Sequence, residues 1–186
     1  LLRSVFEQGD AWYPTGDLFR CDEDGDYWLV DHVADVIRGR SRPLASIPIE
    51  DAVWELECVS MAAAYGVRLE SVEHEIPVVA VVLRPGTDLD PGALFDCVRE
   101  GLDRESRPAV VHVVDAIPMT AGYRFLKEPL RAAGLESAAV NHERALWHDP
   151  VAKKYRPLDA AALCCLAETL RLRQEKRPRQ HTRPEK

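Results

Sequence analysis

The sequence has no long hydrophobic run and no leader segment. Its longest strongly apolar run, residues 78–83, is far shorter than the roughly 20 residues needed to cross a bilayer. No charged-then-apolar segment precedes the first polar motifs, so nothing resembles a signal peptide. The chain begins at Leu1 rather than at a methionine, and we expect it to start within a longer protein. These absences predict a cytoplasmic protein without a membrane-spanning segment.

Cysteine is scarce and shows no pairing pattern. The chain has five cysteines, an odd number, and no two of them have C-x-x-C spacing. This argues against a disulfide framework. We expect reduced, mostly buried thiols at Cys21, Cys58, Cys97, Cys164 and Cys165.

Excess positive charge is confined to the C-terminus. The formal net charge is −7, which divides into −12 for residues 1–170 and +5 for residues 171–186. Because phosphate backbones are bound by clustered basic side chains, the acidic body argues against nucleic acid as a partner. For the basic tail we expect a solvated, disordered terminus, with peripheral contact to an anionic membrane surface as the alternative.

The remaining composition is that of a globular protein. Of the 186 residues, 46% are hydrophobic and 30% are charged, which fits one domain with appendages. Residues 12–18 and 20–31 predict a β-hairpin, because β-branched and aromatic side chains stand on both sides of the turn formers at 22–25. The acidic turn also resembles half of a calcium loop. The bidentate glutamate expected later in such a loop is missing, and we favour a hairpin turn over a metal site.

Four segments combine helical periodicity with residues that start or stop helices. Apolar side chains recur at intervals of three and four, which places them on one face of each helix. We expect helices over residues 46–56, 90–102, 128–133 and 159–172, with Ser46, Asp90 and Asp159 as N-terminal caps and Gly134 as the stop of the third.

Three short apolar runs predict β-strands. Residues 61–67 and 76–83 are nearly all apolar and are joined by a charged segment, which predicts a buried antiparallel pair. Residues 109–114 are the third candidate. The order of these elements predicts an α+β fold: an N-terminal β-hairpin, then a small domain with a short three-stranded sheet packed by helices.

A Thr-Gly-Asp turn at residues 15–17 is the first candidate site. A carboxylate held on a tight turn by glycine can accept two hydrogen bonds from the vicinal hydroxyls of a ribose. Three residues alone are a weak signal, and composition and periodicity indicate no reaction.

Longer motifs, read in order, carry a family resemblance. The motifs are WYPTGDL at 12–18, YWLVDHVAD at 27–35, Ile37-Arg38, Glu50, YGV at 65–67, Arg107-Pro108, MTAGYRFLK at 119–127 and YRPL at 155–158. Together they resemble the adenylate-forming acyl-CoA synthetases over residues 1 to about 160. Within that superfamily they are most similar to the branch of fatty acid transport proteins and very-long-chain acyl-CoA synthetases.

The resemblance implies a two-domain enzyme of which this chain holds the C-terminal portion. Residues 1–33 would be the end of the large AMP-binding domain, a β-hairpin, together with the hinge. Residues 34–135 would be the C-terminal lid domain, 136–172 an extension with a helix, and 173–186 a basic disordered tail.

The implied reaction has two halves. A fatty acid carboxylate attacks the α-phosphate of ATP and releases pyrophosphate, and coenzyme A then displaces AMP to form the acyl-CoA. The implied cofactors are ATP or AMP, coenzyme A and Mg²⁺, bound mostly by the missing N-terminal domain. The implied partners are the fatty acid and that domain, and the resemblance implies no metal ligand in this chain.

The resemblance implies nucleotide contacts and a hinge in the first part of the chain. Asp17 matches the aspartate that holds the AMP ribose hydroxyls. His32 stands where an arginine reaches the nucleotide, and Arg38 is likewise implied to bind it. Ala34 and Asp35 fall at the hinge between the domains.

Two cations in the late loop are the implied catalytic residues. Arg124 occupies the place of the lysine that bridges the acyl carboxylate and the phosphate, and Lys127 stands where the branch often has a second lysine. For Lys127 itself we favour a solvent-exposed structural role over a catalytic one. At 124 a planar guanidinium replaces the compact ammonium of the family lysine. At 32 an imidazole, whose charge depends on pH, replaces the permanently charged family arginine. We therefore expect weakened adenylation.

Two functional hypotheses follow from this resemblance. The first is a C-terminal part of an ATP-dependent long- or very-long-chain fatty acid CoA ligase, inactive without its N-terminal domain. The second is a non-catalytic remnant or regulatory module that docks on another acyl-CoA synthetase, motivated by the departures at His32 and Arg124.

Overall fold

The computed structural model describes residues 1–70, 72–135 and 144–175. Its strands are β1 (Leu2–Arg3), β2 (Ala11–Trp12), β3 (Asp17–Cys21), β4 (Tyr27–His32), β5 (Val59–Arg68), β6 (Glu75–Leu83), β7 (Val110–Val113), β8 (Ala145–Asp149) and β9 (Lys154–Pro157). Its helices are α1 (Ile47–Trp54), α2 (Pro91–Gly101), α3 (Glu128–Ala133) and α5 (Ala160–Glu175). Residues 176–186, most of the basic tail, lie outside the described residues.

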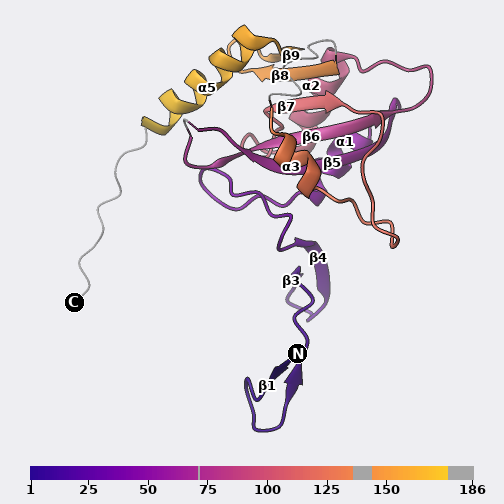
Figure 1. The fold of residues 1–186 in the computed structure, drawn as a ribbon, viewed down its shortest axis with the longest axis vertical. Helices are drawn as coiled ribbons and strands as arrows, with labels where there is room; N and C mark the ends of the chain where they lie inside the picture. Colours follow the sequence, from indigo (N-terminus) through magenta and orange to yellow (C-terminus); the bar gives the residue numbers. More distant parts are fainter. Residues whose placement is uncertain (71, 136–143, 176–186) are drawn as a thin grey trace.

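The first four strands form two ribbons that project from the body of the molecule (Figure 1). β1 pairs with β2, and β3 pairs antiparallel with β4. A hairpin around the predicted turn is therefore confirmed, but its first strand begins at Asp17 rather than at residue 12. Its turn is built by Asp22, whose carboxylate accepts from the backbone N–H groups of Asp24 and Asp26 and from Nε1 of Trp28, at 2.9–3.1 Å. The first acid of the apparent calcium loop therefore organises the turn, as expected from the hairpin interpretation.

The body is one sheet in the order β5-β6-β7-β8-β9. The expected antiparallel pair corresponds to β5 and β6, and β7 joins β6 in parallel after the crossover through α2. The α+β class is confirmed, but the sheet has five strands rather than three. β8 and β9 come from residues 145–157. Buried and partly buried side chains alternate along β8, whereas in β9 only Tyr155 is buried. These two strands gain their stability by pairing with each other and with β7.

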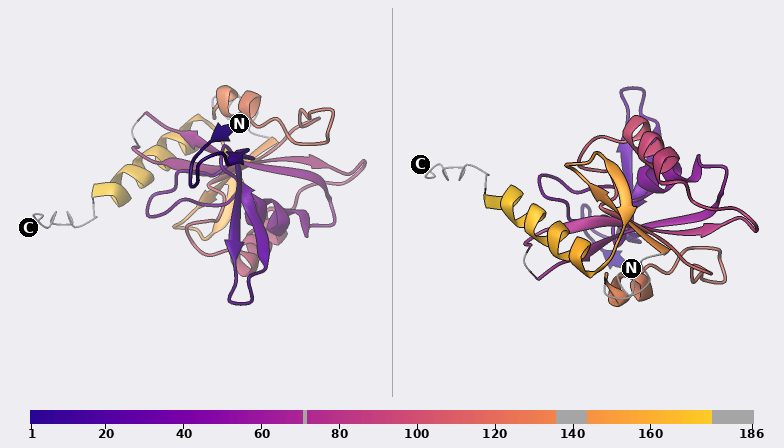
Figure 2. Two further views of the ribbon diagram at one scale, coloured as in Figure 1. Left: turned by 90° about the horizontal axis from the view of Figure 1, so that it is seen from below. Right: turned by 90° about the horizontal axis from the view of Figure 1, so that it is seen from above.

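Helices cover both faces of the sheet, as Figure 2 shows. Residues of α1 and α2, including Val53 and Leu94, pack on one face against β5 and β6. Leu130 of α3 and Leu166 of α5 pack on the other. Adjacent β5 residues serve opposite faces: Ala64 belongs to the first cluster and Tyr65 to the second. This double burial explains why β5 and β6 are almost entirely apolar.

Three of the four expected helix-boundary residues act as predicted. The Asp90 carboxylate accepts from the Ala93 N–H at 2.8 Å, and that of Asp159 from the Ala162 N–H at 2.7 Å. Gly134 follows α3 with a φ of 58°. The expectation for Ser46 is wrong, because its side chain makes no capping bond to α1. The Ser46 hydroxyl instead donates to Asp31 at the end of β4.

The cysteines are free, but the expectation that most are buried is wrong. Cys21, Cys164 and Cys165 are exposed, and Cys58 and Cys97 are half-buried. Among the described residues, no helix combines the length and apolar character that crossing a membrane requires.

Candidate functional site

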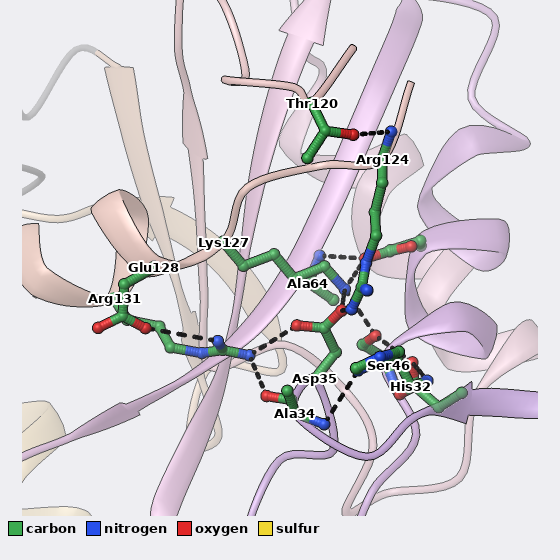
Figure 3. Close-up of polar contacts among 12 residues, drawn as sticks. His32, Ala34, Asp35, Ser46, Ala64, Thr120, Arg124, Lys127, Glu128 and Arg131 are labelled. Atoms are coloured by element: carbon green, nitrogen blue, oxygen red, sulfur yellow. Dashed lines mark hydrogen bonds and ion pairs between the residues drawn. The ribbon is translucent and has the colours of Figure 1, made fainter. Parts of the chain in front are cut away.

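The centre of the candidate site is the ammonium group of Lys127, just before α3 (Figure 3). Its side chain is only 5% exposed. Nζ donates to Oγ of Ser46 at 2.7 Å, lies 2.6 Å from Oε1 of Glu50, and lies 3.9 Å from Oδ2 of Asp35. The expectation of a solvent-exposed lysine is therefore wrong, and in this conformation the ammonium is already occupied by Ser46, Glu50 and Asp35.

Ser46 connects this lysine to the end of the β3–β4 hairpin. Its hydroxyl accepts from Lys127 and donates to Oδ1 of Asp31 at 3.0 Å, and its backbone N–H donates to the other carboxylate oxygen. Asp31 is 1% exposed and also accepts from the N–H of His32 at 2.8 Å. A buried carboxylate is tolerated when several donors face it, as here. Asp31 thus fastens the hairpin to the start of α1.

Glu50 of α1 balances the charge of Lys127 and also forms a hydrogen bond with the edge strand of the sheet. Its Oε1 accepts from the backbone N–H of Ala64 at 2.8 Å, a group on the edge strand β5. Burial raises the pKa of the Glu50 carboxyl, although the nearby Lys127 ammonium works in the opposite direction. The pair is therefore a buried connection between α1, β5 and the residues that precede α3.

Asp35 receives the two arginines of this region. Oδ2 accepts from an Nη of Arg124 at 3.2 Å, and Oδ1 accepts from an Nη of Arg131 at 3.1 Å. Burial by itself would raise the pKa of Asp35, but the charge of Lys127 and the hydrogen bonds from both arginines outweigh it, so the pKa lies below its ordinary value. Asp35 therefore stays ionised as the common partner of three cations, two by hydrogen bonds and Lys127 as an ion pair.

The backbone at the implied hinge is held by hydrogen bonds as well. The Ala34 N–H donates to Nδ1 of His32 at 3.2 Å, and the Asp35 N–H donates to the His32 carbonyl at 2.8 Å. The Ala34 carbonyl accepts from Arg131 at 3.0 Å. Any rotation about residues 34 and 35 must disturb these contacts.

Arg124 is presented by a tight turn in the loop between β7 and α3. The Thr120 N–H donates to the Arg124 carbonyl at 2.8 Å, and the Arg124 N–H donates to Oγ1 of Thr120 at 3.2 Å. Tyr123 adopts a φ of 61°, which is uncommon for a side chain of this kind. The Arg124 side chain remains 49% exposed, so part of its guanidinium faces solvent.

Asp17 and His32 face each other across the β3–β4 pair, where they are ladder partners. The Asp17 N–H donates to Oγ1 of Thr15 at 3.1 Å, and the exposed Asp17 carboxylate has no hydrogen bond or ion pair with any residue that the structure describes. Gly16 has a φ of 80°, and a Cβ there would lie 2.9 Å from Nε2 of His32. Glycine is thus required both by the turn and by the imidazole beside it.

Arg38 lies apart from these groups. Its backbone N–H donates to Oε2 of Glu75 and its carbonyl accepts from the Glu75 N–H, both at 2.9 Å. The structure thus places Arg38 beside the start of β6 through its main chain.

The structure joins most of the candidate residues into one network. Asp35 contacts Arg124 and Lys127 directly. Its chain neighbour Ala34 is joined to the network by Arg131, and His32 contacts Ala34. Sequence reasoning missed Arg131. The spacing of four between Lys127 and Arg131 at the start of α3 was an available signal, because such residues lie on one face of a helix.

Residues 48–122 match the family described as the AMP-binding enzyme C-terminal domain. Curated relatives include the human long-chain fatty acid transport protein 5, with 27% identity over 86% of this chain and 23% of the relative. They also include the 4-coumarate–CoA ligase-like 9 of Oryza sativa subsp. japonica, with 32% identity over 66% of this chain and 22% of the relative. The chain thus spans about a quarter of the length of these relatives.

Two solved structures are similar to this chain over about two thirds of its length. The amide bond synthetase McbA from Marinactinospora thermotolerans is 33% identical, with a TM-score of 0.57 over 64% of this chain and 24% of that one. The o-succinylbenzoate CoA synthetase from Bacillus subtilis, in complex with its acyl-adenylate intermediate, is 25% identical, with a TM-score of 0.61 over 69% of this chain and 25% of that one. The same synthetase is also known in complex with ATP and a magnesium ion.

Proposed function

We propose that this chain is the lid-bearing part of a fatty acid CoA ligase. The proposal is supported by the match of residues 48–122 to the AMP-binding enzyme C-terminal domain family and by the similarity to a long-chain fatty acid transport protein over 23% of that relative. Such a ligase forms an acyl adenylate and then an acyl-CoA. The proposed substrate is a long- or very-long-chain fatty acid, and activity requires a large N-terminal AMP-binding domain.

The proposed domain division follows from the same reasoning. Residues 1–33 complete the large domain and lead into the hinge, residues 34–135 form the lid, and residues 136–172 extend it. The many large apolar side chains left exposed on the two projecting ribbons support this division, since they would be covered by the rest of a large domain. They include Leu2, Phe6, Trp12, Phe19, Tyr27 and Trp28.

The observation that carries the proposal is the position of Arg124. A half-exposed guanidinium stands at the tip of a tight turn and is joined through Asp35 to the segment implied to be the hinge. A cation in that position can approach and leave a negatively charged reaction centre as the lid turns. We propose that Arg124 contacts the acyl carboxylate and the phosphate during adenylation.

Asp17 fits the role of a ribose ligand. Its carboxylate is exposed, and the hydrogen bond from the Asp17 N–H to Thr15 holds the turn without using a carboxylate oxygen. Two free oxygens can accept from two vicinal hydroxyls. We propose that His32, opposite Asp17 in the ladder, packs beside the nucleotide and that Arg38 contributes positive charge from the lid side of the hinge.

The bound groups supply the reactive centres: ATP the α-phosphoryl group that the carboxylate attacks, and coenzyme A the thiol that displaces AMP. The described residues contain no cluster of three acids, histidines or cysteines suited to a metal ion, so a Mg²⁺ that accompanies ATP would be held by ATP and the N-terminal domain. In this chain, Arg124 is the proposed cation in contact with the reacting oxygens. Lys127 would replace it only if its contacts with Ser46 and Glu50 were broken.

The proposal is tested by joining the chain to the AMP-binding domain of a long-chain fatty acid transport protein. Palmitate-dependent pyrophosphate release measures adenylation, and acyl-CoA formation measures the second half-reaction. We expect both activities, and we expect Asp17→Ala to reduce them. A folded fusion that has neither activity would contradict the proposal.

The second candidate function is a non-catalytic module that docks on another synthetase. It is favoured by the arginine at 124 and the histidine at 32, which stand where the resemblance implies a lysine and an arginine. The combined variant Arg124→Lys and His32→Arg separates the two functions in the same fusion. A large gain in adenylation would indicate a weakened enzyme, whereas no activity before or after the exchange would favour a docking module.

A further inference from the structure

Asp35 binds three cations that differ in how firmly they are held. Lys127 has Ser46 and Glu50 as further partners, and Arg131 also donates to the Ala34 carbonyl and lies 3.9 Å from Glu128. The guanidinium of Arg124 has Asp35 as its sole partner among the residues that the structure describes. Arg124 is therefore the one cation of the three that can leave Asp35 without breaking another contact of its side chain.

We propose that Asp35 is a positioning residue that holds Arg124 at the hinge in the orientation seen here. Breaking the contact between Arg124 and Asp35 then has two effects at once: it frees Arg124 to reach the reaction centre, and it removes one restraint on the hinge. The catalytic consequence rests on the proposed function. The contact between Arg124 and Asp35 and its effect on the hinge are properties of this chain alone.

The release of Arg124 is made easy by its surroundings. Its side chain is half-exposed, so water replaces the hydrogen bond that is lost, whereas Asp35 is nearly buried. When Arg124 leaves, Asp35 keeps Arg131 at 3.1 Å and Lys127 at 3.9 Å. A buried carboxylate is costly only when it is left without partners, which does not happen here. Asp35 can therefore exchange Arg124 repeatedly while remaining ionised.

The same contact restrains the hinge. The main chain at Ala34 and Asp35 is already held by His32 and Arg131. Arg124 adds a third attachment, from a loop that is 89 residues distant in sequence. While this attachment is present, the loop that presents Arg124 and the hinge move together. Its loss leaves Arg131 as the remaining arginine on Asp35.

An arginine at position 124 suits this double role better than a lysine. The planar guanidinium can donate one Nη to Asp35 while its other nitrogens remain available to a second acceptor. A lysine ammonium is a single point of charge on a flexible stem. The arginine that departs from the family pattern thus has a structural reason, because it can keep one contact on the hinge while it approaches another anion.

The first test uses the full 186-residue chain and needs no activity. The rate at which phenylglyoxal modifies Arg124 is measured by peptide mass spectrometry in the original chain and in Asp35→Asn. We expect at least a threefold rise, because the guanidinium loses its charged partner. Asp35→Glu should restore much of the protection. Asp115→Asn, which removes the partner of Arg144, is the matched control and should expose Arg144 but not Arg124.

A second variant guards against general unfolding of Asp35→Asn. Arg124→Gln keeps Asp35 paired with Arg131 and Lys127, and its effect is followed by hydrogen exchange at the Ala34 and Asp35 amides. We expect these amides to exchange several-fold faster while amides of β5 and β6 remain unchanged. Unchanged hinge exchange in Arg124→Gln, or equal Arg124 modification in folded Asp35→Asn and the original chain, would overturn the proposal.

The effect of Asp35 on the two half-reactions is measured in the fusion with an AMP-binding domain. We expect Asp35→Asn to change the ratio of adenylation to acyl-CoA formation at least threefold, since Arg124 is no longer held at the hinge. An equal loss of both half-reactions would indicate a purely structural aspartate and would contradict the positioning role. An inactive fusion would count against the proposed ligase function, whereas the modification and exchange experiments would still decide the contact itself.

Discussion

Nζ of Lys127 lies 2.6 Å from Oε1 of Glu50, with only 5% and 16% of the two side chains exposed. This pair joins the start of α3 to α1, and through the Ala64 N–H it reaches the edge strand β5. Because both charges are largely removed from water, each depends on the other for compensation. The loop that carries Arg124 ends at this anchored lysine.

Removing Lys127 should destabilise the folded chain strongly. In Lys127→Met the Glu50 carboxylate loses its cation and Ser46 loses a donor, and we expect a loss of about 3 kcal/mol in the free energy of unfolding. Urea denaturation followed by circular dichroism measures it. Adding Glu50→Gln should recover part of the loss, because the neutral amide can still accept from Ala64. Lys154→Met on exposed β9 is the control, and an equally small effect for both lysines would refute the prediction.

His112 should make stability depend on pH. Its Nε2 lies 2.7 Å from the Tyr65 hydroxyl, and burial, with a smaller contribution from Arg144, lowers the pKa of His112 from 6.5 to about 4. Between pH 6.5 and about pH 4, His112 is therefore protonated in the unfolded chain but not in the folded chain. Stability present at neutral pH should fall through this window, by about 3 kcal/mol in total.

Unfolding free energies measured between pH 7 and pH 4 test this dependence, and His112→Gln should flatten the curve relative to the original chain. Asp115→Asn serves as a control for the carboxylates, since it removes the exposed partner of Arg144 without touching the His112–Tyr65 contact. A curve of the same slope in His112→Gln would assign the pH dependence to other groups.

Alanine should be tolerated much less at Gly16 than at Gly25. Both glycines have positive φ values, 80° and 88°, so each substitution carries a similar backbone cost of about 1 kcal/mol. Only at Gly16 would the new Cβ collide with the ring of His32, 2.9 Å away, whereas nothing lies within 4 Å at Gly25. We expect Gly16→Ala to displace the His32 ring and speed amide exchange across β3 and β4. NMR spectra that respond equally to both substitutions would contradict this.

Asp17 should be required for nucleotide affinity in a fusion with an AMP-binding domain. Removing the carboxylate that we propose accepts two hydrogen bonds from the ribose should weaken AMP binding by about 1.5–3 kcal/mol, or at least tenfold. Calorimetric titration of AMP into Asp17→Ala measures this change. Asp24→Ala, on the hairpin turn at the other end of β3, should bind AMP like the unaltered fusion. Equal affinity in both variants would remove Asp17 from the proposed site.

Local sequence was sufficient where neighbouring residues decide the structure. The Asp90 cap of α2, the glycine after α3 and the turn at Asp22 all depend on contacts within a few residues, and each follows the expectation. The antiparallel pairing of β5 and β6 was also predictable, because two nearly continuous apolar runs must be buried on both faces.

Long-range contacts decided the rest. The motif order by itself indicated an adenylate-forming lid, with Asp17 at a turn and Arg124 in a loop. Only the tertiary structure decided that Ser46 bonds Asp31 rather than capping α1, that Lys127 is buried against Glu50, and that Asp35 gathers Arg124 and Arg131. These pairs form between residues 15 to 96 positions apart in the sequence. Folding brings each carboxylate to a donor that its own neighbourhood in the sequence does not supply.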